Sequence, residues 1–286
     1  MTKAATGLRR TLGYGALLFF VVAMSGNASA QAGDAERILK AMSDYLTSQK
    51  AMMVSFDTDI EVITPDLQKI QFASSGKLLL RRPDKLRFSR TGGYADIDVT
   101  FDGNTLTVYG KNLQSYAQFE SPGTVDEIIG RLRDDHNVGA PGADFLLSNV
   151  YDELIEEVLE AKYIGRGVID GVECEHLAFR NADTDWQIWI ELGDRPIPRK
   201  YVITSKTVAG APQYTLRIKE WASNVGIFAE SFEFQPPEGA MKLPLEALAC
   251  LWPNLHELLA DRCAWTVEQR EGAGPGDFQR KLKTNP

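Results

Sequence analysis

The pair of residues most able to do chemistry together is Cys174 and His176, which lie two positions apart. The alternating pattern from Cys174 to Phe179 predicts a strand, and residues two apart on a strand point to one face. A thiol beside an imidazole could act as a nucleophile or could bind a metal ion. Because no third ligand is evident nearby, a buried structural pair is the stronger interpretation.

Other polar residues show no spacing typical of a catalytic or metal site. His136 and His256 are far from the third histidine. Asp96, Asp98 and Asp102 could suggest a hard-cation site, but their alternation with apolar residues places them on the wet face of a strand. No nucleophile-elbow, phosphate-loop or dinucleotide motif occurs. We therefore expect no enzyme, no cofactor and no metal ion.

The first 30 residues have the pattern of a secretory signal peptide. Basic residues precede an apolar run from Leu12 to Met24, and Ala28-Ser29-Ala30 supplies small residues for cleavage. The apolar run is shorter than the roughly 20 residues that span a bilayer. We expect cleavage near Ala30 and Gln31, followed by release into the periplasm.

Charge and cysteine content limit the partners and the covalent framework. The net charge is −8, and it becomes more negative when the three basic residues of the leader are removed. An acidic surface argues against nucleic acid or anionic lipid headgroups as the main partner. Cys250 and Cys263 are close enough in sequence to be a disulfide candidate, which leaves Cys174 as a buried small hydrophobe.

The spacing of apolar residues changes along the chain, and this spacing predicts the elements that must position any site. Residues 34–49 carry apolar side chains at helical spacing, with Asp34 as a possible N-cap. A two-residue period follows and predicts about eleven strands. These strands lie within 54–62, 71–80, 85–88, 96–101, 105–109, 167–172, 174–179, 186–190, 200–204, 214–221 and 230–234.

Two amphipathic helices are predicted to interrupt the strands. The first covers 124–134 and begins with a capping box formed by Thr124 and Glu127. The second covers 143–159. Beyond the last strand, residues 244–286 are predicted to form a helical extension and a disordered tail, so the expected domains are 1–30, 31–243 and 244–286.

The physical consequence is an α+β fold in which an antiparallel sheet has one apolar face that helices must cover. If the helices pack fully, the interior is an ordinary core. If they pack loosely, it is a ligand cavity. The pattern of residues is the same in both cases.

Several motifs resemble those of bacterial periplasmic lipoprotein carriers. They are Gly76 to Pro83 with Leu86-Arg87-Phe88, the hairpin Phe101 to Tyr109, and the closing segment Glu230 to Gly239. More closely, residues 36–243 are similar to a family of predicted periplasmic proteins of unknown function. That family shares the blocks Asp170 to Phe179 and Asp185 to Ile190.

The resemblance implies a strongly curved, unclosed half-barrel of about eleven antiparallel strands, covered by an N-terminal helix and an inserted helical lid. In the carriers the enclosed apolar cavity holds acyl chains of lipoproteins. Their arginine before proline helps to hold the lid closed, and Arg82 matches it. A sheet-edge arginine paired with an acidic neighbour is the alternative for Arg82.

The expected function is therefore a soluble, monomeric periplasmic carrier for a lipid or a lipoprotein acyl chain. An envelope membrane protein that loads or accepts the cargo is the expected partner. A ligand-free protein-interaction or stress-sensing module on the same fold is the alternative. The expected cavity residues are Phe56, Ile60, Phe72, Leu78, Leu80, Leu86, Phe88, Ile97, Val99, Phe101 and Trp186. The expected lid residues are Arg82, Ile128, Ile129, Leu132 and Leu147.

Overall fold

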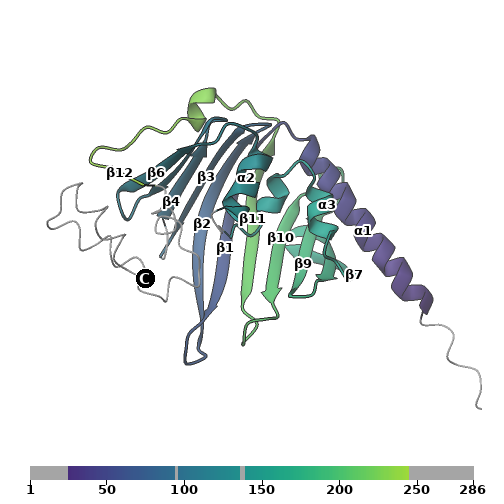
Figure 1. Cartoon of the computed structure of the whole chain (residues 1–286). Helices are drawn as coiled ribbons and strands as arrows, with labels where there is room; N and C mark the ends of the chain where they lie inside the picture. Colours follow the sequence, from purple (N-terminus) through teal and green to yellow (C-terminus); the bar gives the residue numbers. More distant parts are fainter. Residues whose placement is uncertain (1–24, 94–95, 136–138, 245–286) are drawn as a thin grey trace, which may run out of the picture.

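The computed structural model describes residues 25–93, 96–135 and 139–244 (Figure 1). The elements in chain order are α1 (Ser25–Ser48), β1 (Ala51–Ile63), β2 (Lys69–Arg81), β3 (Lys85–Gly92), β4 (Asp96–Phe101), β5 (Thr105–Gly110), β6 (Ser115–Glu120), α2 (Val125–Asp134), η1 (Ala143–Leu146), α3 (Val150–Ile155), β7 (Glu160–Ile169), β8 (Val172–Arg180), β9 (Thr184–Glu191), β10 (Pro198–Ser205), β11 (Gln213–Ser223), η2 (Ala229–Phe232) and β12 (Met241–Leu243).

The strands form one sheet in the order β12-β6-β5-β4-β3-β2-β1-β11-β10-β9-β8-β7. Neighbouring strands are antiparallel except for β12 and β6, which are parallel. The α+β class is as predicted, but the sheet has 12 strands rather than eleven. The sheet is open, as expected, but it is not strongly curled, which corrects the expected strong curvature of the half-barrel. The open ends are the edge strands β12 and β7.

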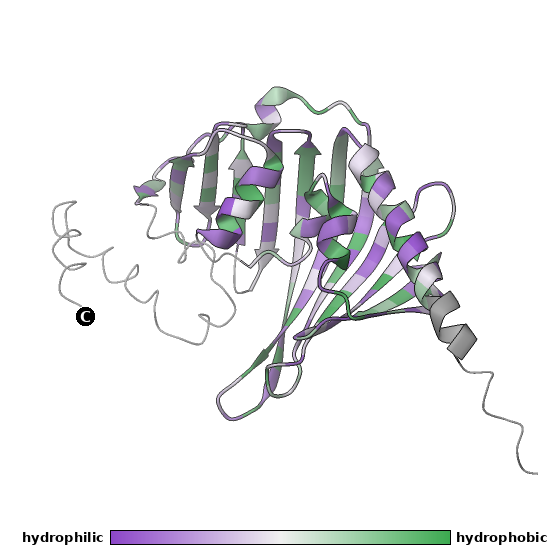
Figure 2. Ribbon diagram, turned by 45° about the vertical axis from the view of Figure 1, so that its right-hand side comes forward, coloured by the Kyte–Doolittle hydropathy of each residue, from purple (hydrophilic) through white to green (hydrophobic). Residues whose placement is uncertain are grey.

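Alternation along the strands explains how one face of the sheet becomes apolar. On β1, Met52, Val54 and Phe56 are at most 6% exposed, whereas Met53 is 43% exposed. Figure 2 shows the same alternation of hydrophobic and hydrophilic residues along the strands. The buried face carries the core that the helices cover.

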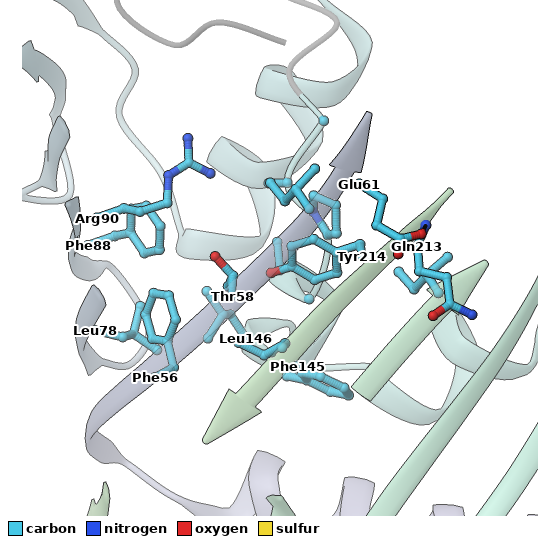
Figure 3. Close-up of a pocket in the computed structure, with 18 of the residues that line it drawn as sticks. Phe56, Thr58, Glu61, Leu78, Phe88, Arg90, Phe145, Leu146, Gln213 and Tyr214 are labelled. Carbon is cyan, nitrogen blue, oxygen red and sulfur yellow. Dashed lines mark hydrogen bonds between the residues drawn. The ribbon is translucent and has the colours of Figure 1, made fainter. Parts of the chain in front are cut away.

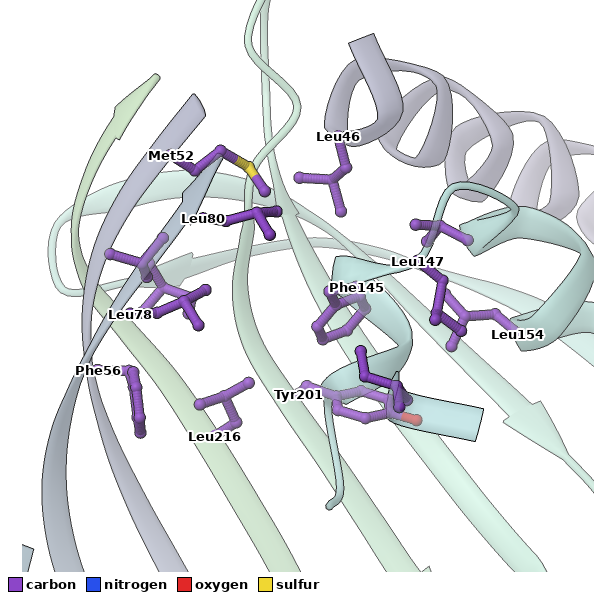
Figure 4. Packing of buried hydrophobic residues seen from close by; sticks show 14 of the residues in the cluster. Leu46, Met52, Phe56, Leu78, Leu80, Phe145, Leu147, Leu154, Tyr201 and Leu216 are labelled. Atoms are coloured by element: carbon purple, nitrogen blue, oxygen red, sulfur yellow. The ribbon is translucent and has the colours of Figure 1, made fainter. Parts of the chain in front are cut away.

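The helix α1 covers the β7 end of the sheet. Leu39, Met42 and Leu46 recur at helical spacing and are fully buried, and the helix packs against β7, β8 and α3. Figure 4 shows Leu46 on this helix near Met52 at the start of β1. The helix ends as predicted but begins at Ser25 rather than Asp34, so it includes the predicted cleavage position.

The segment between β6 and β7 forms one of the two predicted helices. The α2 helix begins with the predicted capping box, in which Thr124 and Glu127 bond to each other's backbone N–H groups. The second predicted helix is replaced by the 3₁₀ turn η1 and the six-residue helix α3. The reason is that the Asp126 carboxylate accepts the Ser148 N–H at 3.1 Å, which takes this N–H out of a continuous helix.

The closing segment also differs from the prediction. Residues 230–234 form no strand, because η2 occupies their first part. Arg87 donates to the Ser231 carbonyl oxygen at 3.2 Å, and Phe232 is fully buried beneath the Arg81 guanidinium. The strand β12 then extends the sheet beyond β6.

Several predictions fall outside the described residues. They are most of the signal peptide (1–24), His136, His256, the Cys250–Cys263 pair and the extension from 245 onward. Within the described part of the chain, no helix has both the length and the apolar character needed to cross a membrane.

Candidate functional site: an apolar cavity under the inserted segment

A cavity of about 850 Å³ lies between the apolar face of the sheet and the segment inserted between β6 and β7. Its walls come from β1, β2, β3, β4, β10 and β11, and its roof from α2 and residues 139–146. Figure 3 shows side chains from these elements pointing toward a shared space. This volume is within the range of about 300–1,000 Å³ that is typical of small-molecule sites.

Two stacked aromatic rings form part of the cavity floor. Phe56 on β1 and Phe88 on β3 stack with ring centroids 5.6 Å apart and planes 14° apart. Gly76 on β2 lies beneath the Phe56 ring, and a Cβ at this position would collide with that ring. The glycine therefore lets the Phe56 ring lie against the intervening strand, where it stacks on Phe88.

The roof leaves the space partly unfilled. Ile129 and Leu132 face it from α2, and Phe145 and Leu146 face it from η1. The Phe145 ring packs edge-on against Tyr201, with centroids 5.1 Å apart. This contact anchors one side of the roof to β10. The space that the roof leaves unfilled lies over β1 to β3.

The polar groups in the lining are few. One is the hydroxyl of Thr58, which shares a hydrogen bond of 2.6 Å with the Ser74 hydroxyl on β2, outside the lining. The indole Nε1 of Trp221 is buried and has no hydrogen-bond partner within the described part of the chain. Arg90 is the basic residue among the described lining residues. A mostly apolar cavity with a few placed polar groups is typical of ligand sites.

The inserted segment is fastened to the sheet beside Arg82. The Arg82 Nη2 donates to the Leu147 carbonyl oxygen at 3.2 Å, and the Val125 N–H donates to the Pro83 carbonyl oxygen at 2.8 Å. Burial lowers the pKa of Arg82, and the nearby Asp126 carboxylate partly offsets this. Arg82 therefore contacts the segment that the sequence predicted as the lid.

A second link joins the two halves of the inserted segment. Arg133 near the end of α2 forms an ion pair of 2.6 Å with Asp144 in η1. Residues 139–142 lie between these elements and line the cavity as part of its roof. Gly142 has a φ of +87°, a conformation that favours glycine, so the chain can turn sharply into η1 there.

A family model described as "Predicted periplasmic protein (DUF2092)" matches residues 35–246, which includes every described wall and roof of the cavity. The chain belongs to this family. Membership in a family of predicted periplasmic proteins was predicted from the sequence and is confirmed. No curated protein sequence matches the chain.

Solved structures resemble this DUF2092 member at low identity. An uncharacterised conserved protein from Thermus thermophilus has a TM-score of 0.44 and 11% identity, covering 74% of this chain and 99% of its own. A "putative outer membrane lipoprotein-sorting protein domain" from Vibrio parahaemolyticus has a TM-score of 0.32 and 9% identity. The match covers 71% of this chain and 97% of that domain. The Mycobacterium tuberculosis lipoprotein LppX has a TM-score of 0.35 and 13% identity. The match covers 68% of this chain and 99% of LppX. At this level the likeness carries no argument about ligands.

The cavity brings together part of the predicted residue set. The predicted residues that line it are Phe56, Ile60, Leu78, Leu86, Phe88, Val99, Ile129 and Leu132. The predicted residues that lie in the packed core instead are Leu80, Ile97, Phe101, Ile128, Leu147 and Trp186. Phe72 is half-buried near the start of β2 and lies outside the lining. Trp186 stacks on Phe179 with centroids 3.9 Å apart, which accounts for its burial.

Sequence reasoning missed the other wall of the cavity. The missed residues include Ile203, Tyr214, Leu216, Ile218 and Trp221 on β10 and β11. The pairing of β1 with β11 brings them beside the predicted residues. Their own alternation was visible, but nothing in the sequence indicated that β11 would be the neighbour of β1.

Cys174 and His176 lie away from the cavity. They share one face of β8, opposite Leu177, which is fully buried in the core. The Cys174 thiol donates to the Val172 carbonyl oxygen at 3.4 Å, and burial raises its pKa to about 11. His176 stacks on Trp189 with centroids 4.0 Å apart.

The imidazole is engaged separately from the thiol. Its Nε2 lies 3.0 Å from the Gln187 Oε1, and burial lowers the pKa of His176. A neutral imidazole and a protonated thiol with different partners form no activated nucleophile. The structural interpretation of this pair is the one that the geometry favours.

The aspartates of β4 form ion pairs on the other face of the sheet. Asp96 and Asp98 lie 2.9 and 3.4 Å from the Lys111 Nζ. Asp102 accepts the backbone N–H groups of Asn104 and Thr105 in the following turn. No group of three or more His, Cys, Asp or Glu residues suited to a metal ion occurs within the described ranges.

Proposed function

We propose that this chain is a periplasmic carrier that binds a lipid or a lipoprotein acyl chain between its sheet and its inserted segment. The observation that carries the proposal is the cavity of about 850 Å³, which the helices roof without filling. An ordinary core would be closed by these same helices at the packing density of protein interiors. The remaining space favours a ligand.

The binding mechanism would be burial of an apolar chain. Each methylene removed from water contributes about 0.8 kcal/mol, so a chain of about a dozen carbons offers on the order of 10 kcal/mol before ordering costs. The stacked rings of Phe56 and Phe88 supply a broad apolar contact surface for this chain. Catalysis has no part in the proposal.

The inserted segment would act as the lid. Its attachment at Arg82 and Pro83 lies at one end, whereas residues 139–142 form part of the roof at the other. A lid that swings about the Arg82 end would lift this part of the roof and admit the ligand. The domain limits of this carrier unit are proposed as 31–243, with 244–286 as a separate extension.

Delivery to the periplasm is part of the same proposal. The family description places its members there as predicted periplasmic proteins, and the first 30 residues have the pattern of a cleaved leader. We propose that the mature chain begins near Gln31 and is a monomer. An envelope membrane protein would load the cargo or accept it.

One observation favours the alternative of a protein-interaction module. The β7 edge of the sheet and the residue before it expose Leu159, Ile164 and Val168, each more than half exposed. An edge strand with exposed apolar side chains can pair with a partner chain. This alternative makes no use of the cavity, so a test of the cavity separates the two functions.

The first test blocks the cavity from one strand. Val54→Trp places a large ring in the cavity, whereas Met53→Trp, its neighbour on the opposite face of β1, is the matched control. We expect the wild type and Met53→Trp to bind the neutral dye N-phenylnaphthylamine, and Val54→Trp to lose this binding. Ile203→Trp, on the opposite wall, serves as a second blocking variant if Val54→Trp does not fold.

The second arm looks for the natural cargo. Native mass spectrometry of the protein purified from its own envelope should show a lipid-sized adduct that the blocking variants lack. Absence of the adduct together with absence of dye uptake by the wild type would contradict the carrier function and leave the interaction module as the better account.

A further inference from the structure

The cavity lining is not uniform along its length. On β3 the side chains that face the cavity are Leu86, Phe88 and Arg90, in that order. Leu86 is 6% exposed, and Phe88 and Arg90 are half-buried. The strand ends at Gly92, two residues after Arg90. The lining therefore changes from aliphatic to aromatic to cationic toward one end of the strand.

Neighbouring strands place hydroxyl groups in the row next to Arg90. Arg90 pairs with Gly76, and Gly92 pairs with Ser74. Ser74 in turn pairs with Thr58, and the two hydroxyls are hydrogen-bonded. A guanidinium and a pair of hydroxyls therefore lie beside the Phe56–Phe88 floor, at the end away from Leu86.

Glu61 is the acidic residue among the described lining residues, and it lies on another wall, where it is paired with Lys69. The Glu61 carboxylate is 2.8 Å from the Lys69 Nζ, and it accepts the Gln213 backbone N–H at 2.9 Å. Figure 3 shows Glu61 beside Gln213, on the opposite side of the cavity from Arg90. The positive charge of Arg90 is thus separated from this carboxylate.

We propose that the cavity selects anionic amphiphiles, with the acidic head group against Arg90 and the apolar chain running over Phe56 and Phe88 toward Leu86. This inference rests on the proposed carrier function and adds the chemical class of the ligand. The head group is a carboxylate or a phosphate ester, since a guanidinium can donate two parallel hydrogen bonds to either group.

The acidic surface of the protein does not oppose this selection. Exposed charges are screened beyond about 8–10 Å at physiological salt, whereas a contact within a cavity of low dielectric is screened much less. A head group at Arg90 therefore experiences the guanidinium more strongly than the carboxylates of the surface. The nearest of these along the strands, Asp96 and Asp98, flank the register partner of Arg90, lie on the other face of the sheet and are paired with Lys111. The acidic surface lowers the rate of encounter with anions but leaves the contact in place.

The test compares head groups on one chain length. Lauric acid, dodecyl phosphate and dodecanol compete with bound N-phenylnaphthylamine on the full chain. We expect both anions to displace the dye at lower concentration than dodecanol. In Arg90→Gln both anions should weaken by about tenfold or more, as expected for loss of a charge-assisted hydrogen bond, with dodecanol unchanged. Arg90→Lys should recover part of the anion affinity.

The control variant is Arg166→Gln on β7, an arginine whose side chain is 66% exposed and lies outside the cavity. It should leave all three affinities unchanged. The relative strength of lauric acid and dodecyl phosphate tells whether a free acid or a phosphorylated lipid fits better.

Two outcomes would overturn the inference while leaving the carrier function intact. One is equal affinity of the wild type for dodecanol and for both anions. The other is a loss in Arg90→Gln that is the same for charged and neutral competitors. Failure of the wild type to bind the dye and dodecanol at all is a different result, because it removes the carrier function itself.

Discussion

At the scale of single residues, the role of Cys174 and His176 depends on the face of β8 that they occupy more than on their residue types. Cys174 and His176 do share a face of β8, as the alternation predicted. That face is on the side away from the cavity, and each side chain has a different partner. The closeness of Cys174 and His176 in the sequence therefore reflects packing on one face of β8 and not a reactive pair.

The Cys174 thiol gives a prediction for pH. Burial raises its pKa to about 11 in the folded chain, from 9.0 for an ordinary thiol. Its contribution to stability is fully present below the unfolded pKa and is lost as the pH rises through the folded pKa, because the unfolded thiol ionises first. We expect the free energy of unfolding to fall between these values, and to fall less in Cys174→Ala.

Denaturant titrations at several alkaline pH values would measure this difference. A maleimide reagent gives a second reading, since the native thiol should react only after unfolding. Rapid labelling of native Cys174 near neutral pH would contradict its burial and would reopen a chemical role.

At the scale of helices and strands, the predictions were accurate where an element depends on neighbouring residues in the sequence. The capping box of α2 depends on Thr124 and Glu127 alone, so it could be read from local sequence. The loss of the second helix depends on a contact between Asp126 and Ser148, residues 22 positions apart. Local periodicity gives no information about such a contact. The same limit hid β6, whose mixed polar and apolar residues pair with β5.

The attachment of the lid gives a prediction at this scale. Arg82→Gln removes the charged donor to the Leu147 carbonyl oxygen, so the inserted segment should open more often. We expect bound dye to dissociate about tenfold faster, which corresponds to the loss of a hydrogen bond from a charged donor. Stopped-flow displacement of the dye measures this rate.

The variant Arg166→Gln is again the matched control, since it removes an exposed arginine that pairs with Glu175 and takes no part in the attachment at Arg82. A dissociation rate that stays at the wild-type value in Arg82→Gln would show that this contact does not hold the lid. Arg82 would then be a structural residue of the sheet edge.

At the scale of the whole molecule, the sequence predicted one wall of the cavity better than the other. Phe56, Leu78 and Phe88 are close together because β1, β2 and β3 follow one another in the chain. Tyr214 and Leu216 join them only because β11 pairs with β1. Pairing between strands so distant in sequence leaves no local signature, so the second wall required the structure.

A ligand that fills the cavity should stabilise the whole fold. A ligand that binds only the folded chain at about 100 times its Kd adds about 2.7 kcal/mol to the free energy of unfolding. We expect lauric acid to raise the Tm of the wild type and of Met53→Trp. Differential scanning fluorimetry measures the shift.

The blocking variant Val54→Trp provides the internal comparison, because it has no space for the ligand and should show no shift. An equal shift in both tryptophan variants would place the ligand outside the cavity.

The pairing of β1 with β11 also has a consequence for how the chain folds. It joins Met52 to Ser223 near the centre of the sheet, while β1 to β6 on one side and β7 to β11 on the other form two meanders of local hairpins. Local hairpins close quickly, but contacts between distant residues carry a larger loop-closure cost and slow the search. The two meanders should therefore form first and dock late. When the chain is exported starting from its N-terminus, the apolar face cannot close until the last long strand, β11, has been exported as well. This interval leaves time for a holding chaperone to bind.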